Sequence, residues 1–446
     1  MKNNGSDDPD APRIIARPEH TVSRADISRN ALKVLQRLDR AGYQAFLVGG
    51  CVRDALLDLH PKDFDVATDA HPDEVKALFG NCRLIGRRFR LAHVRFGREI
   101  IEVATFRASA ETPEDHADAV LDTEGRILRD NVYGSIDSDV WRRDFTCNAL
   151  YYNIADFSIW DYVGGVSDIE NRRLVLIGDP VTRLREDPVR MLRAVRFAAK
   201  LDFTIDPDVS AAMHRHAGLV TSVPPARLFD EFTKLFQGGH AERTFELLWE
   251  YRLFDQLFPE TSAALAEDEQ FGRFVRAALV NTDRRVRSGK PVTPMFLLGV
   301  LFWGPVRKAA NKRRETEKMS ESQAIALSAY ELTGLHQSRI AIPKRFSAPM
   351  RDMLALQPRF EQRRGKRAMK LLDNRRFRAA YDFLMLRAET GEADPEQSAF
   401  WTDVQSLSEE ERAERFKVQD QPRSGHGRKK RRTRRRRRRS PAEHDA

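Results

Sequence analysis

The sequence predicts an α+β fold: a head with a small mixed β-sheet, then all-helical domains, and a basic C-terminal tail. Short apolar runs separated by glycine turns occupy the first 178 residues, and amphipathic helical patterns follow from about residue 179. Eleven of the twelve residues from Arg428 to Arg439 are Lys or Arg. The change from mixed strand and helix patterns to helical patterns alone indicates separate domains.

The domain boundaries follow these changes of pattern. We expect a mobile N-terminus over residues 1–20, the head over 21–178, a helical neck over 179–250, a helical body over 251–415 and a disordered Arg-rich tail over 416–446. A chain of 446 residues is long enough for several domains, each with its own core.

Net charge and cysteine content limit the classes of protein to which this chain can belong. The chain carries +10, and subtracting the eleven charges of the tail leaves −1 for the rest. A polybasic arm binds polyanions such as RNA through counterion release, and the alternatives are a solubility tail or a surface that touches anionic lipid. Cys51, Cys82 and Cys147 are widely spaced, which argues against a disulfide scaffold or structural zinc. With no secretory signal or membrane-length apolar run, a soluble cytoplasmic protein is predicted.

The head elements can be predicted in order. A helix follows Ser23 or Ser28, either of which can cap it, and ends before Gly42. A strand precedes the Gly49–Gly50 turn, a helix begins at about Cys51, and a second strand begins near Lys62 after the break at Pro61. The further expected elements are a helix over 72–79, strands over 82–86, 91–94 and 99–106, a polar loop over 107–125, and strand-like runs over 159–165 and 174–177.

The second strand carries two carboxylates. Asp63 and Asp65 are two residues apart, so on a strand both side chains leave the same face. A glycine turn a few residues earlier lets backbone N–H groups approach a phosphate. Neither a dinucleotide-binding nor a P-loop glycine motif is present at this turn. The combination indicates metal-assisted phosphoryl or nucleotidyl transfer.

These residues resemble the active-site signature of the class II nucleotidyltransferases, which include bacterial poly(A) polymerases and tRNA CCA-adding enzymes. Further matching segments are Gly49-Gly50 with Arg53-Asp54, Arg142-Arg143-Asp144-Phe145-Thr146-x-Asn148-Ala149, Asp161-Tyr162-x-Gly164-Gly165 and Glu186-Asp187-Pro188-x-Arg190. The match covers most of the chain.

The resemblance implies roles for individual residues. Asp63 and Asp65 are expected to hold two Mg²⁺ ions, with Glu102 as a third ligand and Asp144 as a further catalytic carboxylate. Which of Glu102 and Asp144 matters more is left open by the sequence. The expected nucleotide-binding residues are Gly49, Gly50, Arg53, Arg143, Asn148, Asp187 and Arg190.

The helical half begins at a capping sequence. Asp187 is a natural N-cap with Pro188 at the first helical position, and Asp187 and Arg190 share a face that can meet the edge of a base. Helices are expected over 225–236 in the neck and over 269–281, 293–303, 320–335 and 367–389 in the body. Basic residues from Arg363 to Lys370 suit either an RNA-binding or a solvated face.

The resemblance implies template-independent addition of AMP from ATP to RNA 3′ ends, in RNA polyadenylation and turnover. A tRNA CCA-adding enzyme is the alternative, because it shares the head and the Mg²⁺ chemistry. A non-catalytic RNA-binding relative is a second alternative, against which the retained acidic residues argue. RNA-decay proteins are implied as partners, and no oligomeric state is predicted.

Overall fold

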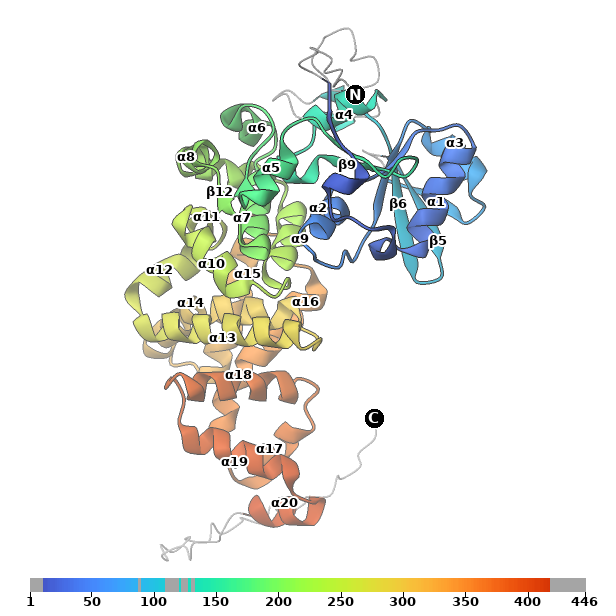
Figure 1. The fold of residues 1–446 in the computed structure, drawn as a ribbon. Coiled ribbons are helices and arrows are strands. Elements are labelled where there is room, and N and C mark those ends of the chain that lie inside the picture. Colours follow the sequence, from blue (N-terminus) through green and yellow to red (C-terminus); the bar gives the residue numbers. More distant parts are fainter. Residues whose placement is uncertain (1–10, 87–89, 109–119, 122–126, 130–132, 418–446) are drawn as a thin grey trace, which may run out of the picture.

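The computed structural model describes residues 11–86, 90–108, 120–121, 127–129 and 133–417. Figure 1 shows a sheet-containing head beside the first neck helices, with α17 to α20 at the far end of the molecule from the head. The described residues thus divide into a β-rich first part and a helical second part, as predicted. The tail from residue 418 onward, for which disorder was predicted, lies outside the described residues.

Eight strands of the described residues form one mixed sheet in the order β1-β10-β9-β2-β3-β6-β5-β4. Only β3 and β6 pair in parallel; the other neighbours are antiparallel. The strands are β1 Arg13–Ile15, β2 Ala45–Val48, β3 Asp65–Thr68, β4 Cys82–Ile85, β5 Leu91–Phe96, β6 Glu99–Thr105, β9 Leu150–Asn153 and β10 Ile159–Asp161. Two short pairs lie apart from it: β7 Val120–Leu121 with β8 Ile127–Arg129, and β11 Arg173–Leu174 with β12 Thr204–Ile205.

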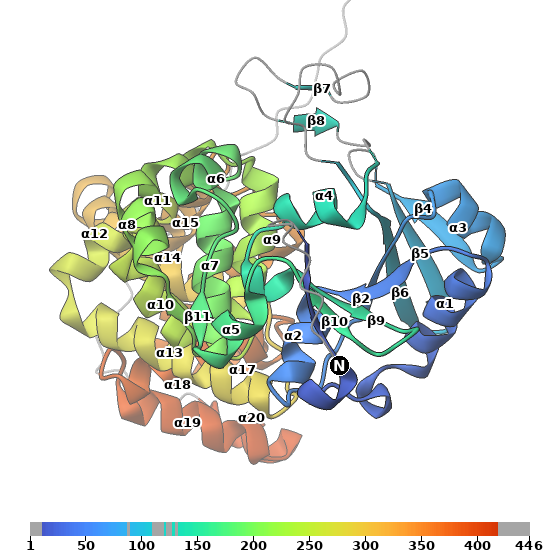
Figure 2. The same cartoon turned by 45° about the horizontal axis from the view of Figure 1, so that its top comes forward.

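The central strand β2 is buried on both faces, and its side chains alternate between two cores. Leu47 joins the large core that includes Val66 of β3 and the apolar face of helix α1 (Arg29–Arg40). Phe46 and Val48 join a smaller core with Ile136 and Val140 of helix α4 (Ile136–Trp141). Figure 2 shows α4 above the sheet, near β7 and β8. The sheet therefore has one face covered by α1 and another covered by α4.

Two expectations about the head are corrected. The strand expected near Lys62 begins at Asp65, so Asp63 lies in the segment just before it. Arg13–Ile15, within the segment expected to be mobile, forms β1 and pairs with β10 at the edge of the sheet. The cap of α1 is as predicted, because Ser28 Oγ accepts hydrogen bonds from the backbone N–H groups of Asn30 and Ala31. Most of the predicted polar loop over 107–125 lies outside the described residues.

The remaining head helices are α2 Gly50–Leu56, α3 Pro72–Leu78 and α5 Gly165–Glu170. The neck contains α6 Pro180–Glu186, α7 Val189–Leu201, α8 Pro207–His216, α9 Pro225–Phe236 and α10 Ala241–Glu250. The body contains α11 Leu253–Leu257, α12 Pro259–Glu267, α13 Glu269–Arg287, α14 Pro294–Glu317, α15 Glu321–His336, α16 Lys344–Ala355, α17 Gly365–Leu372, α18 Phe377–Glu389, α19 Pro395–Ser406 and α20 Glu409–Arg415.

Two predictions about the helices are also corrected by the structure. The helix expected over 367–389 is two helices, α17 and α18, interrupted between Leu372 and Phe377. Helix α7 begins at Val189, one residue later than a cap at Asp187 requires, although Asp187 Oδ1 still accepts from the Val189 N–H at 3.3 Å. Among the helices of the described residues, none is both long and apolar enough to cross a bilayer.

Candidate active site

A cavity of about 930 Å³ lies between the head and the neck. Its walls come from the β2–α2 turn, the start of β3, the segment 142–148, α7 and α9. Ten of the lining residues are Lys or Arg and five are Asp, so the cavity suits an anionic ligand that brings negative charge to a mainly cationic wall. All of the predicted site residues except Glu102 line it.

The glycine turn forms one wall. Gly49 has φ +74° and ψ −134°, a backbone conformation that residues with a side chain rarely adopt. A Cβ at Gly49 would lie 3.9 Å from Nη1 of Arg143, so the guanidinium of Arg143 faces this turn. The glycine turn predicted from the sequence is found between β2 and α2, and its contact with a phosphate stays a prediction.

The acidic residues gather at the start of β3. Asp65 is in register with Glu102 on the parallel strand β6, so both side chains leave the same face of the sheet. Burial, followed by repulsion from Glu102 and Asp63, raises the pKa of Asp65 to about 6, and Arg143 partly opposes this rise. Glu102 itself lies 3.2 Å from Nε2 of His93 on β5. Near Asp65, the negative charges of Glu102 and Asp63 thus outweigh the positive charge of Arg143.

Asp144 lines the cavity with Asp63 and Asp65, and its carboxylate is paired with the neck. Its Oδ2 accepts a hydrogen bond from Nε of Arg193 on α7 at 2.6 Å, and its Oδ1 accepts from the Phe145 N–H at 2.8 Å. Burial alone would raise the pKa of Asp144, but the charge and hydrogen bonds of Arg193 outweigh it and lower the pKa. Asp144 therefore links the head to α7, and the charges that act on Asp65 are those of Glu102, Asp63 and Arg143 instead.

Arg53 and Asn148 belong to the same link. Nη1 of Arg53 donates to Oδ1 of Asn148 at 2.5 Å, and the guanidinium also pairs with Asp54 and lies 5.1 Å from the ring of Phe197. Nδ2 of Asn148 donates to Asp144 at 3.3 Å. Arg53 is 2% exposed, so it supports the cavity wall more than it reaches into the cavity.

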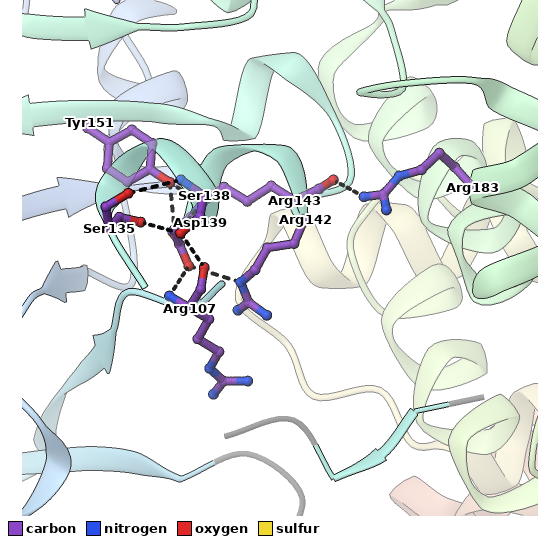
Figure 3. Close-up of polar contacts among 8 residues, drawn as sticks. All are labelled: Arg107, Ser135, Ser138, Asp139, Arg142, Arg143, Tyr151 and Arg183. Carbon is purple, nitrogen blue, oxygen red and sulfur yellow. Dashed lines mark hydrogen bonds and ion pairs between the residues drawn. The ribbon is translucent and has the colours of Figure 1, made fainter. Parts of the chain in front are cut away.

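Arg143 is held by a buried network, shown in Figure 3. Its Nε and Nη2 donate to Oδ2 of Asp139 at 3.1 and 2.8 Å, and Nε also donates to the hydroxyl of Tyr151 at 2.7 Å. Its backbone carbonyl accepts from Nη2 of Arg183 on α6 at 2.6 Å. Both the side chain and the backbone of Arg143 are thereby fixed.

Asp187 and Arg190 both have protein partners. Arg227 of α9 forms a two-pronged pair with the Asp187 carboxylate, at 2.8 and 2.7 Å. Nη1 of Arg190 donates to the carbonyl of Arg183 and to Glu186, at 2.6 and 2.9 Å. The structure therefore brings these two residues to the cavity with their hydrogen-bonding groups already engaged.

A row of cationic residues on α7 was missed by the sequence analysis. Arg193, Arg196 and Lys200 all line the cavity, together with Phe197. Their spacing of three and four residues puts them on one helical face. The pattern Arg-x-x-Arg-Phe-x-x-Lys is present in the sequence, but on its own it is typical of the solvated face of an amphipathic helix.

Comparison with known proteins assigns the family. The family model for the poly(A) polymerase head domain matches residues 45–175. A model described as a probable RNA and SrmB-binding site of polymerase A matches 202–265, and one described as the polymerase A arginine-rich C-terminus matches 317–439. Poly(A) polymerase I of Escherichia coli O6:H1 is 50% identical over 84% of this chain and 82% of its own length. The chain belongs to the poly(A) polymerase I family.

Other relatives agree with this assignment. Poly(A) polymerase I of Haemophilus influenzae is 44% identical over 92% of this chain and 91% of its own. The CCA-adding enzyme of Bacillus subtilis is 37% identical over 51% of this chain and 55% of its own. The solved CCA-adding enzyme of Bacillus stearothermophilus in complex with CTP has a TM-score of 0.56 at 24% identity and covers 84% of this chain and 82% of its own, which shows the fold alone. Resemblance to CCA-adding enzymes at the sequence level is thus shorter than resemblance to poly(A) polymerases.

Proposed function

We propose that this chain catalyses template-independent addition of AMP from ATP to RNA 3′ ends, with release of pyrophosphate. The observation that carries the proposal is the cavity in which the glycine turn and the acid pair of the head face the basic row of α7. The poly(A) polymerase I relatives support ATP as the nucleotide and RNA as the acceptor.

The acidic residues suit Mg²⁺, and we propose Asp63, Asp65 and Glu102 as its ligands. Oxygen donors are what Mg²⁺ prefers, and the raised pKa of Asp65 indicates negative charge that a cation would offset. Among the described residues, no three Asp, Glu, His or Cys side chains converge as they would around a bound metal. Carboxylates together with substrate phosphates form the usual Mg²⁺ site, so ATP would complete this one. Bound Mg²⁺ would lower the pKa of the RNA 3′-hydroxyl and offset charge on the leaving pyrophosphate.

The chain's own groups do the positioning. The Gly49–Gly50 turn and Arg143 both line the cavity, where backbone N–H groups and the guanidinium can hold a triphosphate. Arg193 and Arg196 of α7 line the same cavity, where cations can track the phosphates of the RNA end. We propose Glu102 as the third acidic residue and Asp144 as the link that keeps Arg193 in place.

We propose that Asp187 and Arg190 read the edge of the incoming base. In the structure Arg227 already pairs with Asp187, so a base must displace that pair. Once the pair is open, a base that cannot bond to these groups leaves them unsatisfied, at about 1–3 kcal/mol for each group. This supports a preference for one nucleotide.

Extension of unrelated RNA primers with each nucleotide separately tests the proposal. We expect strong preference for ATP and products that lengthen well beyond three residues. If tRNA that lacks its 3′ end instead receives two cytidines and one adenosine and then stops, the chain is a CCA-adding enzyme. If no nucleotide is added with Mg²⁺ while RNA still binds, it is a non-catalytic relative. A cytoplasmic location and RNA-decay partners remain predictions from the sequence.

A further inference from the structure

Asp139 on α4 is a buried carboxylate that accepts hydrogen bonds from four residues of the head. It is 3% exposed. Its Oδ1 accepts from Nε of Arg142 at 3.0 Å and from the backbone N–H of Arg107 at 3.3 Å. Its Oδ2 accepts from Arg143 and from the hydroxyl of Tyr151, at 2.8 Å each (Figure 3). Both oxygens therefore have strong donors, and the charge is balanced by two arginines.

Three of the partners of Asp139 lie next to different parts of the active site. Arg107 lies two residues beyond β6, the strand that carries Glu102. Tyr151 lies on β9 in register with Val48, the residue immediately before the glycine turn. Arg143 faces Gly49 and acts on the charge of Asp65. The carboxylate is thus tied to the acidic strand, to the turn and to the cation between them.

The contacts fix how Arg143 can point. Two of its nitrogens, Nε and Nη2, are committed to Asp139 and Tyr151, and the ring of Tyr151 lies 4.9 Å from the guanidinium carbon. Nη1 is the nitrogen that remains toward the Gly49 turn. Because the guanidinium is planar, contacts that hold Nε and Nη2 also fix the direction of Nη1, whereas an unrestrained arginine side chain can point in several directions.

We propose that Asp139 is a positioning residue for ATP: it holds the Arg143 guanidinium against the glycine turn so that the guanidinium meets the triphosphate. The inference rests on the proposed function, because it takes ATP to be the ligand of this cavity. Burial would raise the pKa of Asp139, but Arg143 and Arg142 outweigh burial and lower it to about 2. Asp139 is therefore charged at any pH at which the enzyme is assayed.

Replacing Asp139 by Asn keeps the shape and removes the charge. We expect Asp139→Asn to raise the KM for ATP about tenfold on saturating RNA primer, while kcat falls less than threefold. Tyr151→Phe, which removes one hydroxyl from the same network, should raise KM by a smaller factor and serves if Asp139→Asn folds poorly. Equilibrium binding of radiolabelled ATP to the full chain with Mg²⁺ should show the same loss of affinity without any turnover.

The double variant decides whether Asp139 acts through Arg143. Arg143→Ala should raise KM at least as much as Asp139→Asn, and Asp139→Asn combined with Arg143→Ala should be no worse than Arg143→Ala alone. Additive effects in that pair, or coupling to Arg142→Ala in its place, would overturn the proposal. So would an unchanged ATP affinity in folded Asp139→Asn.

A matched control is available in the neck. Asp206 also accepts from an arginine, Arg173, at 2.6 Å and from a backbone N–H at 3.0 Å, but it does not line the cavity. Asp206→Asn should lower thermal stability and leave the KM for ATP unchanged. If the wild-type chain binds ATP but adds no AMP to RNA, the proposed function fails while the binding comparison still tests Asp139.

Discussion

Removal of one acidic charge from the active site should make the metal-free protein more stable. Asp65 is pushed toward its neutral form, since burial, Glu102 and Asp63 raise its pKa from 3.8 to about 6. A carboxyl whose pKa is raised in the folded state stabilises that state fully at low pH, where it is neutral. This stabilisation is lost as pH rises through about 6 and the carboxyl ionises. Asp65→Asn keeps the shape without the charge, so the variant avoids this loss.

The size of the effect follows from the pKa. A rise from 3.8 to about 6 corresponds to about 3 kcal/mol in the absence of solvent screening. Protein atoms crowd Asp65, yet its side chain is exposed to the cavity, where water screens the repulsion. We therefore expect Asp65→Asn to raise the free energy of unfolding by about 1 kcal/mol at pH 7.5, an increase in Tm of about 1–3 °C.

Differential scanning calorimetry in EDTA, at pH 7.5 and at pH 4, measures this. The gain should be present at pH 7.5 and shrink at pH 4, where the folded wild type already carries the proton. Excess Mg²⁺ should raise the Tm of the wild type more than that of the variant, because the variant loses a ligand. Asp206→Asn, in which a paired carboxylate is removed, should instead lower Tm. A variant less stable than wild type at pH 7.5 in EDTA would refute the reasoning.

Three further outcomes are expected. Asp63→Asn should abolish AMP addition in a primer-extension assay with Mg²⁺ while RNA binding stays largely intact, and substantial residual extension would remove Asp63 from the catalytic role. Deletion of residues 424–446 should flatten the slope of log affinity for RNA against log salt, since eleven cationic groups are lost; an unchanged slope would mean that these residues do not contact RNA. Gly49→Ala should lower the free energy of unfolding by about 1–2 kcal/mol in urea titration, because φ is +74° there. An Ala variant as stable as wild type would show that the turn tolerates a side chain.

Local patterns in the sequence were enough to find the turn and the acid pair. Gly49, Asp63 and Asp65 lie within seventeen residues, and the turn and strand that carry them are set by nearby residues. The start of β3 was misplaced because an Asp-Phe-Asp alternation looks like a strand whether or not its first residue is paired. Short-range patterns locate such elements but set their ends poorly.

Contacts between distant segments were not predictable in the same way. Arg227 reaches Asp187 from forty residues away, and Arg193 reaches Asp144 from forty-nine. Each arginine on its own is typical of a solvated helix face, so only the packing of α7 and α9 against the head reveals the pair. The sequence does not single out Asp139 either, because two of its partners, Arg107 and Tyr151, meet it only in the folded chain.

The polar link between the head and α7 also limits which segments can be exchanged between related enzymes to make chimeras. Asp144 of the head meets Arg193 of α7, Asn148 and Arg53 of the head support Asp144, and Lys200 of α7 reaches Asp54 of α2 at 3.0 Å. A graft that replaced the head alone would leave buried charges of one parent facing the wrong partners in the other, at a cost of several kcal/mol. In evolution and in the construction of chimeras, the head and α7 should therefore be inherited as one module, with natural crossover points after Leu201 rather than at the end of the sheet.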